Sequence, residues 1–280
     1  MSSTTRLSGT ARPTRPRVGP LALGLRQGRV EILQFLRSRE SVVFTMLFPV
    51  LLILIFGSIF KGDIGGGVSF TQYFVTGMIA SGLVSVGFQN LAIQIPGDRD
   101  RGVLKRLRGT PMPPWVYLAG KVIMVAAIAV AETVLLLAAA TLLFGLDLPT
   151  TAGRWLTFAW VSLLGITACT LCGIAFSSVA RTGRSASATA TPVALVLQFI
   201  SGVFFVFTEL PSWMQQIAAL FPLKWMCQGL RSVFLPTEFG AQEPAGSYEL
   251  GRVALVLGLW CVLGLLLCLR TFRWTPRRDG

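Results

Sequence analysis

The sequence predicts an all-α polytopic membrane protein with six transmembrane helices, an N-terminal interfacial helix and a re-entrant outer helix pair before the last span. Of its 280 residues, 53% are hydrophobic and only 13% are charged, whereas average soluble domains carry roughly 25% charged residues. Several windows of about 18 or more residues are mostly apolar, which is the length that crosses a bilayer core of roughly 30 Å. Lysine and arginine gather in the segments between these windows. Together these observations exclude a soluble globular protein.

The basic residues set the expected topology. The six expected spans are residues 41–60, 70–95, 116–144, 154–178, 186–207 and 250–270. With a cytoplasmic N-terminus, 20 of the 25 lysines and arginines fall on the cytoplasmic side, which is the positive-inside bias. Both termini are therefore expected in the cytoplasm. The basic charge is a topology signal with acidic inner-leaflet lipids as partners, and we expect no nucleic acid.

The domain organisation follows from the same division. Residues 1–20 are rich in Arg, Pro, Ser and Thr and contain no apolar stretch, so they are expected to be a disordered cytoplasmic tail and not a signal peptide. The transmembrane domain covers 21–270, and 271–280 form a second cytoplasmic tail. Within 20–39, apolar residues recur on one helical face, which predicts an amphipathic helix lying at the inner interface. A cytosolic extension of the first span is the alternative.

Small residues and prolines mark the expected packing of the spans. Pro49 interrupts the first span, where we expect a kink. The second span carries Gly77, Gly82 and Gly87, and the fifth opens with SASATATP and reaches Pro192. Small residues let helices approach closely. These two spans are therefore expected to pack tightly, either within one chain or across a dimer.

Residues 209–236 are expected to form the outer helix pair. Pro211 and Pro222 cut the segment into two apolar pieces of about ten residues, each too short to cross the bilayer. Trp213 and Trp225 are placed to lie at headgroup level. No internal repeat is evident, so the inverted-repeat design of many secondary transporters is not supported.

Several kinds of chemistry find no support in the residues. The chain has no histidine, which removes His-based triads and His metal sites. No GxxxxGK[ST] motif occurs, so the chain has no P-loop of its own for ATP. Cys169 and Cys172 have CxxC spacing, but thiols inside a membrane helix behave as small apolar residues. We therefore expect no cofactor or metal on this chain.

The main charged segment between two spans is residues 96–115. We call it the coupling loop, because a short rigid helix there could pass motion from a soluble partner into the membrane. Val103, Leu104 and Leu107 fall on one face of a short helix, and basic residues take the other. Asp98 and Asp100 are expected in its first turn, where the helix dipole favours negative charge. Thr110-Pro111 and Pro113-Pro114 are expected to end it. A loop that serves topology alone is the alternative.

The stretch DRDRGVLKRLRGTP, residues 98–111, resembles the cytoplasmic-loop signature of type-2 ATP-binding-cassette (ABC) exporter permeases. In that family the pattern is roughly acidic-Arg-acidic-x-Gly-Thr-Leu-x-x-Leu-x-x-Thr-Pro; here Asp replaces the usual Glu twice and Val103 replaces Thr. The segment FPLKW, residues 221–225, resembles the family's apolar-Pro motif in the outer pair. The resemblance covers nearly the whole chain.

This resemblance implies a membrane subunit in a prokaryotic cytoplasmic membrane. Two permease chains would pair, with a homodimer expected first and a heterodimer as the alternative. Each would sit on a separate cytosolic ABC ATPase subunit, two copies per complex, which would bind ATP and Mg. The missing P-loop agrees with a separate energy source. The residues implied in ATPase contact are Arg99, Arg101, Leu104, Arg106 and Leu107, and also Glu31.

The resemblance also implies a route along the dimer interface, lined by the first, second and fifth spans. Glu132 lies deep in the third span, where an ionisable group is a functional candidate. It is expected either to bond Gln89, Asn90 or Gln198, or to line the route. The candidate route residues are Phe44, Phe48, Phe88, Gln89, Glu132, Phe199, Phe204 and Phe205. Lipid-facing or core packing of each phenylalanine is the alternative.

An aromatic, weakly polar route would suit a hydrophobic or amphipathic compound such as a drug or a natural product. Lipid or polysaccharide export by the same family is the second reading. A stand-alone secondary transporter is the third, and it would predict several intramembrane acids and a repeat. A membrane-embedded enzyme finds no histidine and no clustered carboxylates in the spans.

Overall fold

The computed structural model describes residues 19–271, apart from 61, 111–112, 114 and 181. The described chain is a bundle of helices, and its only β pairing is an isolated bridge between Asp63 and Ser69. The two expected tails, 1–20 and 271–280, lie almost wholly outside the described residues. So do Pro111 and Pro114, which were expected to help end the charged helix.

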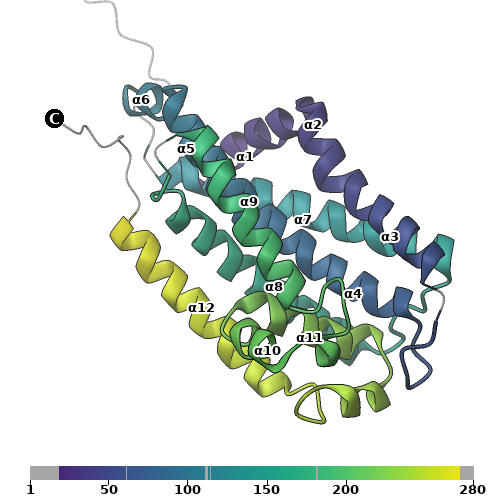
Figure 1. The fold of residues 1–280 in the computed structure, drawn as a ribbon. Coiled ribbons are helices and arrows are strands. Elements are labelled where there is room, and N and C mark those ends of the chain that lie inside the picture. Colours follow the sequence, from purple (N-terminus) through teal and green to yellow (C-terminus); the bar gives the residue numbers. More distant parts are fainter. Residues whose placement is uncertain (1–18, 61, 111–112, 114, 181, 272–280) are drawn as a thin grey trace, which may run out of the picture.

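Twelve α-helices make up the described bundle (Figure 1). Their bounds are α1 Pro20–Arg37, α2 Arg39–Val42, α3 Phe48–Ile59, α4 Phe70–Val84, α5 Asn90–Asp100, α6 Val103–Arg108, α7 Trp115–Phe144, α8 Ala152–Phe176, α9 Gly183–Ile200, α10 Ser212–Ala218, α11 Pro222–Phe234 and α12 Leu250–Thr271. Two π-helical turns, Val43–Leu47 and Ser85–Gln89, join α2 to α3 and α4 to α5. Two 3₁₀ turns, Phe207–Glu209 and Thr237–Gln242, lie near the outer pair.

Five helical segments in the described chain are long and apolar enough to cross a membrane. They are Arg39–Ile59, Phe70–Asp100, Trp115–Phe144, Ala152–Phe176 and Leu250–Thr271. Each overlaps an expected span.

The remaining expected span, 186–207, corresponds to α9. The first half of α9 is polar, which explains why it is not among the five apolar segments. The predicted end at residue 207 is wrong, because the helix stops at Ile200 and Gly202 adopts a left-handed conformation with φ of 75°. Such a conformation suits glycine and ends a helix. Whether α9 crosses the bilayer as a sixth span stays a prediction.

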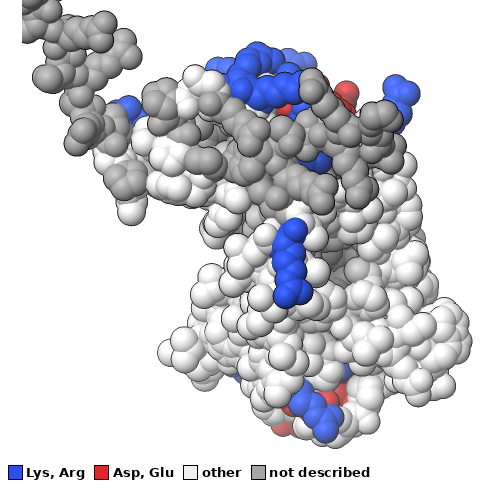
Figure 2. Space-filling view, turned by 90° about the vertical axis from the view of Figure 1, so that its left-hand side faces the viewer, with Lys and Arg blue, Asp and Glu red and all other residues white. Residues whose placement is uncertain are grey.

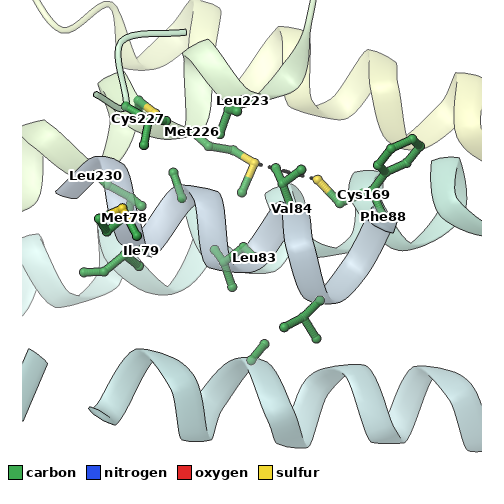
Figure 3. Packing of buried hydrophobic residues seen from close by; sticks show 14 of the residues in the cluster. Met78, Ile79, Leu83, Val84, Phe88, Cys169, Leu223, Met226, Cys227 and Leu230 are labelled. Atoms are coloured by element: carbon green, nitrogen blue, oxygen red, sulfur yellow. Dashed lines mark hydrogen bonds between the residues drawn. The ribbon is translucent and has the colours of Figure 1, made fainter. Parts of the chain in front are cut away.

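The second span is the hub of the bundle. In its most apolar window 72% of the residues are buried, compared with 17% in the first and last spans. Helices α3, α7, α8 and α11 all pack on α4. Figure 3 shows Val84 of α4 next to the pair formed by Met226 of α11 and Cys169 of α8. There the Cys169 thiol lies 4.0 Å from the Met226 sulfur, so Cys169 packs as an apolar residue.

A π-helical turn lies just before Pro49, where the sequence predicts a kink. The backbone N–H of Phe48 donates to the carbonyl of Val43, five residues earlier. Pro49 follows directly and has no N–H to offer to the carbonyl of Thr45. The wider turn just before Pro49 therefore absorbs part of the irregularity that the proline imposes.

The expected outer pair is present as two helices. Pro211 is the N-cap of α10 and Pro222 is the first residue of α11, so both prolines mark helix starts. Trp213 is exposed, but Trp225 is buried and its indole N–H donates to the carbonyl of Ala219 at 2.8 Å. The ring of Trp225 therefore packs inside the pair, and its depth at headgroup level stays a prediction.

Candidate functional site

The charged segment is built differently from the predicted helix. Asp98 and Asp100 lie in the last turn of α5 and not in the first turn of α6. Helix α5 runs through Pro96, and the break comes at Gly102, whose φ is 72°. The predicted dipole stabilisation of these carboxylates is therefore wrong, because a helix C-terminus disfavours negative charge.

Partners from other helices compensate both carboxylates. Asp100 Oδ2 accepts a hydrogen bond from the backbone N–H of Gly183, the first residue of α9, at 2.6 Å. Asp98 accepts from Arg101 at 2.8 Å and from the Tyr117 hydroxyl at 2.8 Å. These bonds attach the end of α5 to the cytoplasmic ends expected for α7 and α9.

A buried ion network lies beneath this segment. The Lys121 ammonium is 2.8 Å from Glu31 Oε2, 2.8 Å from Asp98 Oδ2 and 3.1 Å from Gln94 Oε1. The three charged side chains are all buried. Removing one member of such a network leaves an uncompensated buried charge. Glu31 therefore joins α1 to α7, and its carboxylate is not on the surface that a docking partner would meet.

The residues implied in ATPase contact divide between the inside and the surface. Leu104 and Arg99 are buried, and Arg99 donates to the carbonyl of Ser177 at 3.3 Å. Arg101 and Arg106 are exposed and Leu107 is partly exposed. Lys105, which belongs to the same turn, is exposed as well. On the face shown in Figure 2, basic side chains gather at the end of the molecule that carries α6.

Glu132 makes none of the hydrogen bonds expected for it. Its carboxylate is 2% exposed, and neither oxygen has a hydrogen-bond partner among the described residues. It lies against Gly82 of α4, where a Cβ would come within 2.5 Å of Oε1. Gln89 instead donates to Thr191 at 3.1 Å, and the amide nitrogen of Asn90 finds no partner in the described part of the chain.

The candidate route phenylalanines form three separate groups. Phe199 contacts Phe204, with 4.8 Å between ring centroids, and Phe205, with 6.2 Å. This group continues through Phe56 and Phe74 to Phe60 and Phe70, four rings that sequence reasoning missed. We call these seven rings the aromatic cluster.

The other two groups lie apart from the aromatic cluster. Phe88 packs edge-on against Phe176 at 5.3 Å and is buried. Phe44 and Phe48 contact each other at 6.3 Å and are exposed. Of the predicted aromatic set, the structure therefore brings Phe199, Phe204 and Phe205 together in one group, and it pairs Phe44 with Phe48 in another.

A second buried ion pair, unforeseen from the sequence, lies beside the expected outer helix pair. Arg231 of α11 is 3.0 Å from Glu243 and donates to the carbonyl of Gly202 at 2.7 Å. Its guanidinium lies over the ring of Tyr73 at 4.1 Å, and the Tyr73 hydroxyl accepts from the backbone N–H of Phe207 at 2.9 Å. Arg231 therefore links α4, α11 and the chain that follows α9.

Lys224 lies on the same helix as Arg231. Its ammonium donates to Gln228 and stands over the ring of Trp225 at 3.7 Å. Burial lowers the pKa of Lys224 to about 8, although Glu243 and Glu249 act in the opposite direction. This burial could not be predicted from the sequence, because a lysine at an expected membrane interface is ordinarily exposed and charged.

Comparison with known proteins agrees with this architecture. Residues 28–235 match the family described as "ABC-2 type transporter". The chain is also 28% identical over 208 residues to the inner membrane transport permease YadH of Escherichia coli (strain K12), a match that covers 73% of this chain and 80% of YadH. The protein of the same name from Shigella flexneri matches to the same extent. The match to the family spans the charged segment, the buried ion network and most of the outer pair, and the chain belongs to the ABC-2 type transporter membrane family.

Proposed function

We propose that the chain is the permease subunit of an ATP-driven exporter that moves a hydrophobic or amphipathic compound, such as a drug or natural product, across the cytoplasmic membrane. One observation supports this most directly. The exposed basic surface of Arg101, Lys105 and Arg106 rests on an inner side that is anchored by buried Leu104 and by the Lys121 network. A surface fixed in this way can receive a push from a docked subunit.

Hydrogen bonds and ion pairs around this surface could transmit its displacement to other helices. Asp98 and Lys121 join the end of α5 to α7, and Glu31 extends the junction to α1. The bond between Asp100 and Gly183 reaches α9. In the proposed mechanism, α6 is the coupling helix, and closure of the ATPase subunits displaces it. Because α1, α7 and α9 are all bonded to the end of α5 or to its partners, these helices would move together with α6.

The wider assembly is part of the proposal. Two copies of the permease would pair, each on its own ATPase subunit, and ATP and Mg²⁺ would bind to those subunits. Both termini would face the cytoplasm. The word "inner membrane" in the name of the E. coli relative supports the cytoplasmic membrane as the location. The apolar segments support repeated crossing of it.

The aromatic cluster supports the class of cargo. Phe60, Phe199 and Phe205 are its exposed members, and they lie on or next to α3 and α9. Aromatic rings bind apolar and amphipathic molecules through large contact areas. Glu132 is a single carboxylate without a relay partner in the described chain, which gives no support to proton-coupled transport.

The test is gentle purification of the tagged chain from its native membrane, followed by identification of the proteins that accompany it. We expect an ABC ATPase at equal stoichiometry, and the number of permease species separates a homodimer from a heterodimer. An Arg106→Glu variant should lose the ATPase, whereas Arg252→Glu, exposed near the start of α12, should retain it. Recovery of the chain without an ATPase in several mild detergents would refute the proposal.

A further inference from the structure

A polar cavity of about 290 Å³ lies between α1–α2 and the ends of α5 and α7. Its lining residues are Glu31, Gln34, Phe35, Ser38, Ser41, Gln94, Asp98, Arg101 and Lys121. Eight of these nine side chains are polar or charged. In Figure 1 the elements that enclose it all lie toward the end of the bundle that carries α6.

The charges in the cavity balance. Glu31 and Asp98 contribute two carboxylates, and Lys121 and Arg101 contribute two cations. The three N–H groups of Lys121 are directed to Glu31, Asp98 and Gln94. A ligand with a net charge would therefore find no excess of the opposite charge, and a zwitterionic ligand would match the lining.

Two parts of the lining suit the two ends of a zwitterion. The Arg101 guanidinium uses one N–H for Asp98 and its side chain is 67% exposed, and a guanidinium carries five N–H donors suited to phosphate. Elsewhere in the lining, the hydroxyls of Ser38 and Ser41 lie 2.7 Å apart, and Glu31 Oε1 accepts a hydrogen bond from the amide of Gln27 at 3.0 Å. These oxygens can accept hydrogen bonds from an ammonium group.

An apolar surface begins beyond this part of the lining. Val43, Phe44 and Leu47 lie two to six residues beyond Ser41 and are 46%, 69% and 53% exposed. They extend about 9 Å along the helix from the cavity. A free zwitterion would leave this surface unused, whereas a lipid would lay its acyl chains on it.

We propose that the cavity between α1–α2 and the ends of α5 and α7 binds the phosphoethanolamine headgroup of an inner-leaflet phospholipid, with the phosphate at Arg101 and the ammonium at Ser38, Ser41 and Glu31. This site needs only the membrane placement of the chain and goes beyond the proposed transport. Because α1, α5 and α7 all line it, a bound lipid would brace the junction at the base of the charged segment.

Native mass spectrometry of the purified full chain, with any subunits that accompany it, tests the site. Phosphatidylethanolamine, phosphatidylcholine and phosphatidylglycerol with identical acyl chains are added at equal concentrations. We expect the ethanolamine lipid to be retained at least about tenfold better than the choline lipid, because three N-methyl groups remove the N–H donors. Equal retention of these two lipids, or a preference for the anionic glycerol lipid, would overturn the proposal.

Two variants tie the binding to this cavity. Ser41→Leu should fill the cavity and lower retention of the ethanolamine lipid about tenfold. Gln34→Leu, at an exposed position, should weaken lipid binding without endangering the fold. Ser58→Leu, on an exposed position of α3, is the matched control and should change nothing. An equal loss of lipid retention in Ser58→Leu would show that the lipid contact is not specific to the cavity and would overturn the proposal. Displacement of the lipid by soluble phosphoethanolamine at a similar concentration would overturn the lipid as the ligand.

Discussion

Lys121 and Glu31 form a buried ion pair, with 2.8 Å between Nζ and Oε2, although 90 residues separate them in the sequence. The pair fixes α1 on α7, along which α1 packs over much of its length. The same ammonium also holds Asp98 of α5. One lysine therefore sets the position of the expected interfacial helix relative to two spans.

Lys121→Met is expected to lower the free energy of unfolding by about 3–5 kcal/mol, because Glu31 and Asp98 would keep buried charges without their cation. Thermal unfolding in detergent, followed by tryptophan fluorescence, measures the change. Adding Glu31→Gln should recover part of the loss. The control is Arg252→Met, which breaks an exposed pair with Glu249 and should cost at most about 1 kcal/mol. Equal effects of the two single variants would contradict the buried network.

Gly82→Ala is expected to destabilise the protein by about 1 kcal/mol, since a Cβ there meets the end of the Glu132 side chain, which has to shift inside the contact of α4 with α7. The matched control is Gly258→Ala in α12, where a Cβ meets nothing within 4 Å. It should be neutral or stabilising by up to about 1 kcal/mol, because alanine is the better helix former. Thermal unfolding distinguishes the two, and a Gly82 variant as stable as the control would show that this helix contact is looser than the structure has it.

Glu132→Leu is expected to raise the free energy of unfolding by about 1–3 kcal/mol, because the carboxylate is buried without a hydrogen-bond partner in the described chain. A lower transport rate in the same variant would keep Glu132 in the proposed route. Glu209→Leu, at an exposed position, should change stability by no more than about 0.5 kcal/mol. A destabilised Glu132 variant would mean that the carboxylate has a partner in the membrane.

The stability of the region around α11 is expected to depend on pH through Lys224. Its pKa is lowered to about 8 in the folded protein, against about 10.4 in an unfolded chain. Between these values the unfolded state binds more protons, so stability should rise as pH increases from about 8 to about 10. Unfolding temperatures across this range measure it. Lys224→Met should flatten the rise, and Lys105→Met, an exposed lysine of α6, should leave it intact. If the unfolding temperature of Lys224→Met still rises with pH, another titratable group causes the rise.

The two leucines of α6 are expected to act differently. Leu104→Asp should destabilise the protein by about 3 kcal/mol or more, because it introduces a charge at a position that is 1% exposed. Leu107→Asp, at a partly exposed position, should leave unfolding unchanged and reduce ATPase binding and transport. Thermal unfolding and pull-down of the ATPase separate these outcomes. Normal transport with Leu107→Asp would remove this side chain from the proposed coupling surface.

Hydropathy predicted most of the fold, because a bilayer demands long apolar helices wherever they occur in the chain. Most of the helix bounds agree with the predicted spans to within a few residues. The end of α9 did not, since Val203 to Val206 continue the apolar pattern and only the left-handed Gly202 breaks the helix. Likewise Pro96 and Gly97 indicate a break in the sequence, whereas α5 continues to Asp100.

The candidate site was less predictable because its contacts are tertiary. Glu31 and Lys121 were both noticeable in the sequence, but nothing in their spacing indicates that they pair. Arg231 and Glu243 carried no signal at all, since each is an ordinary charged residue near a loop. Only three of the seven rings in the aromatic cluster were predicted. The phenylalanines of the fifth span were considered, whereas Phe56 of the first span and Phe74 of the second were not.

The burial of α4 sets how freely each part of this chain can change in evolution. A residue of α4 meets protein on nearly every side, so a replacement must fit several helices at once. A residue on the outer face of α12 meets mainly the surroundings of the bundle, and many apolar side chains satisfy that demand. Deep mutational scanning should therefore show a narrow choice of amino acids along α4 and a broad one along α12. Sequences of related permeases would therefore differ first at the exposed helices such as α12 and last at the buried α4.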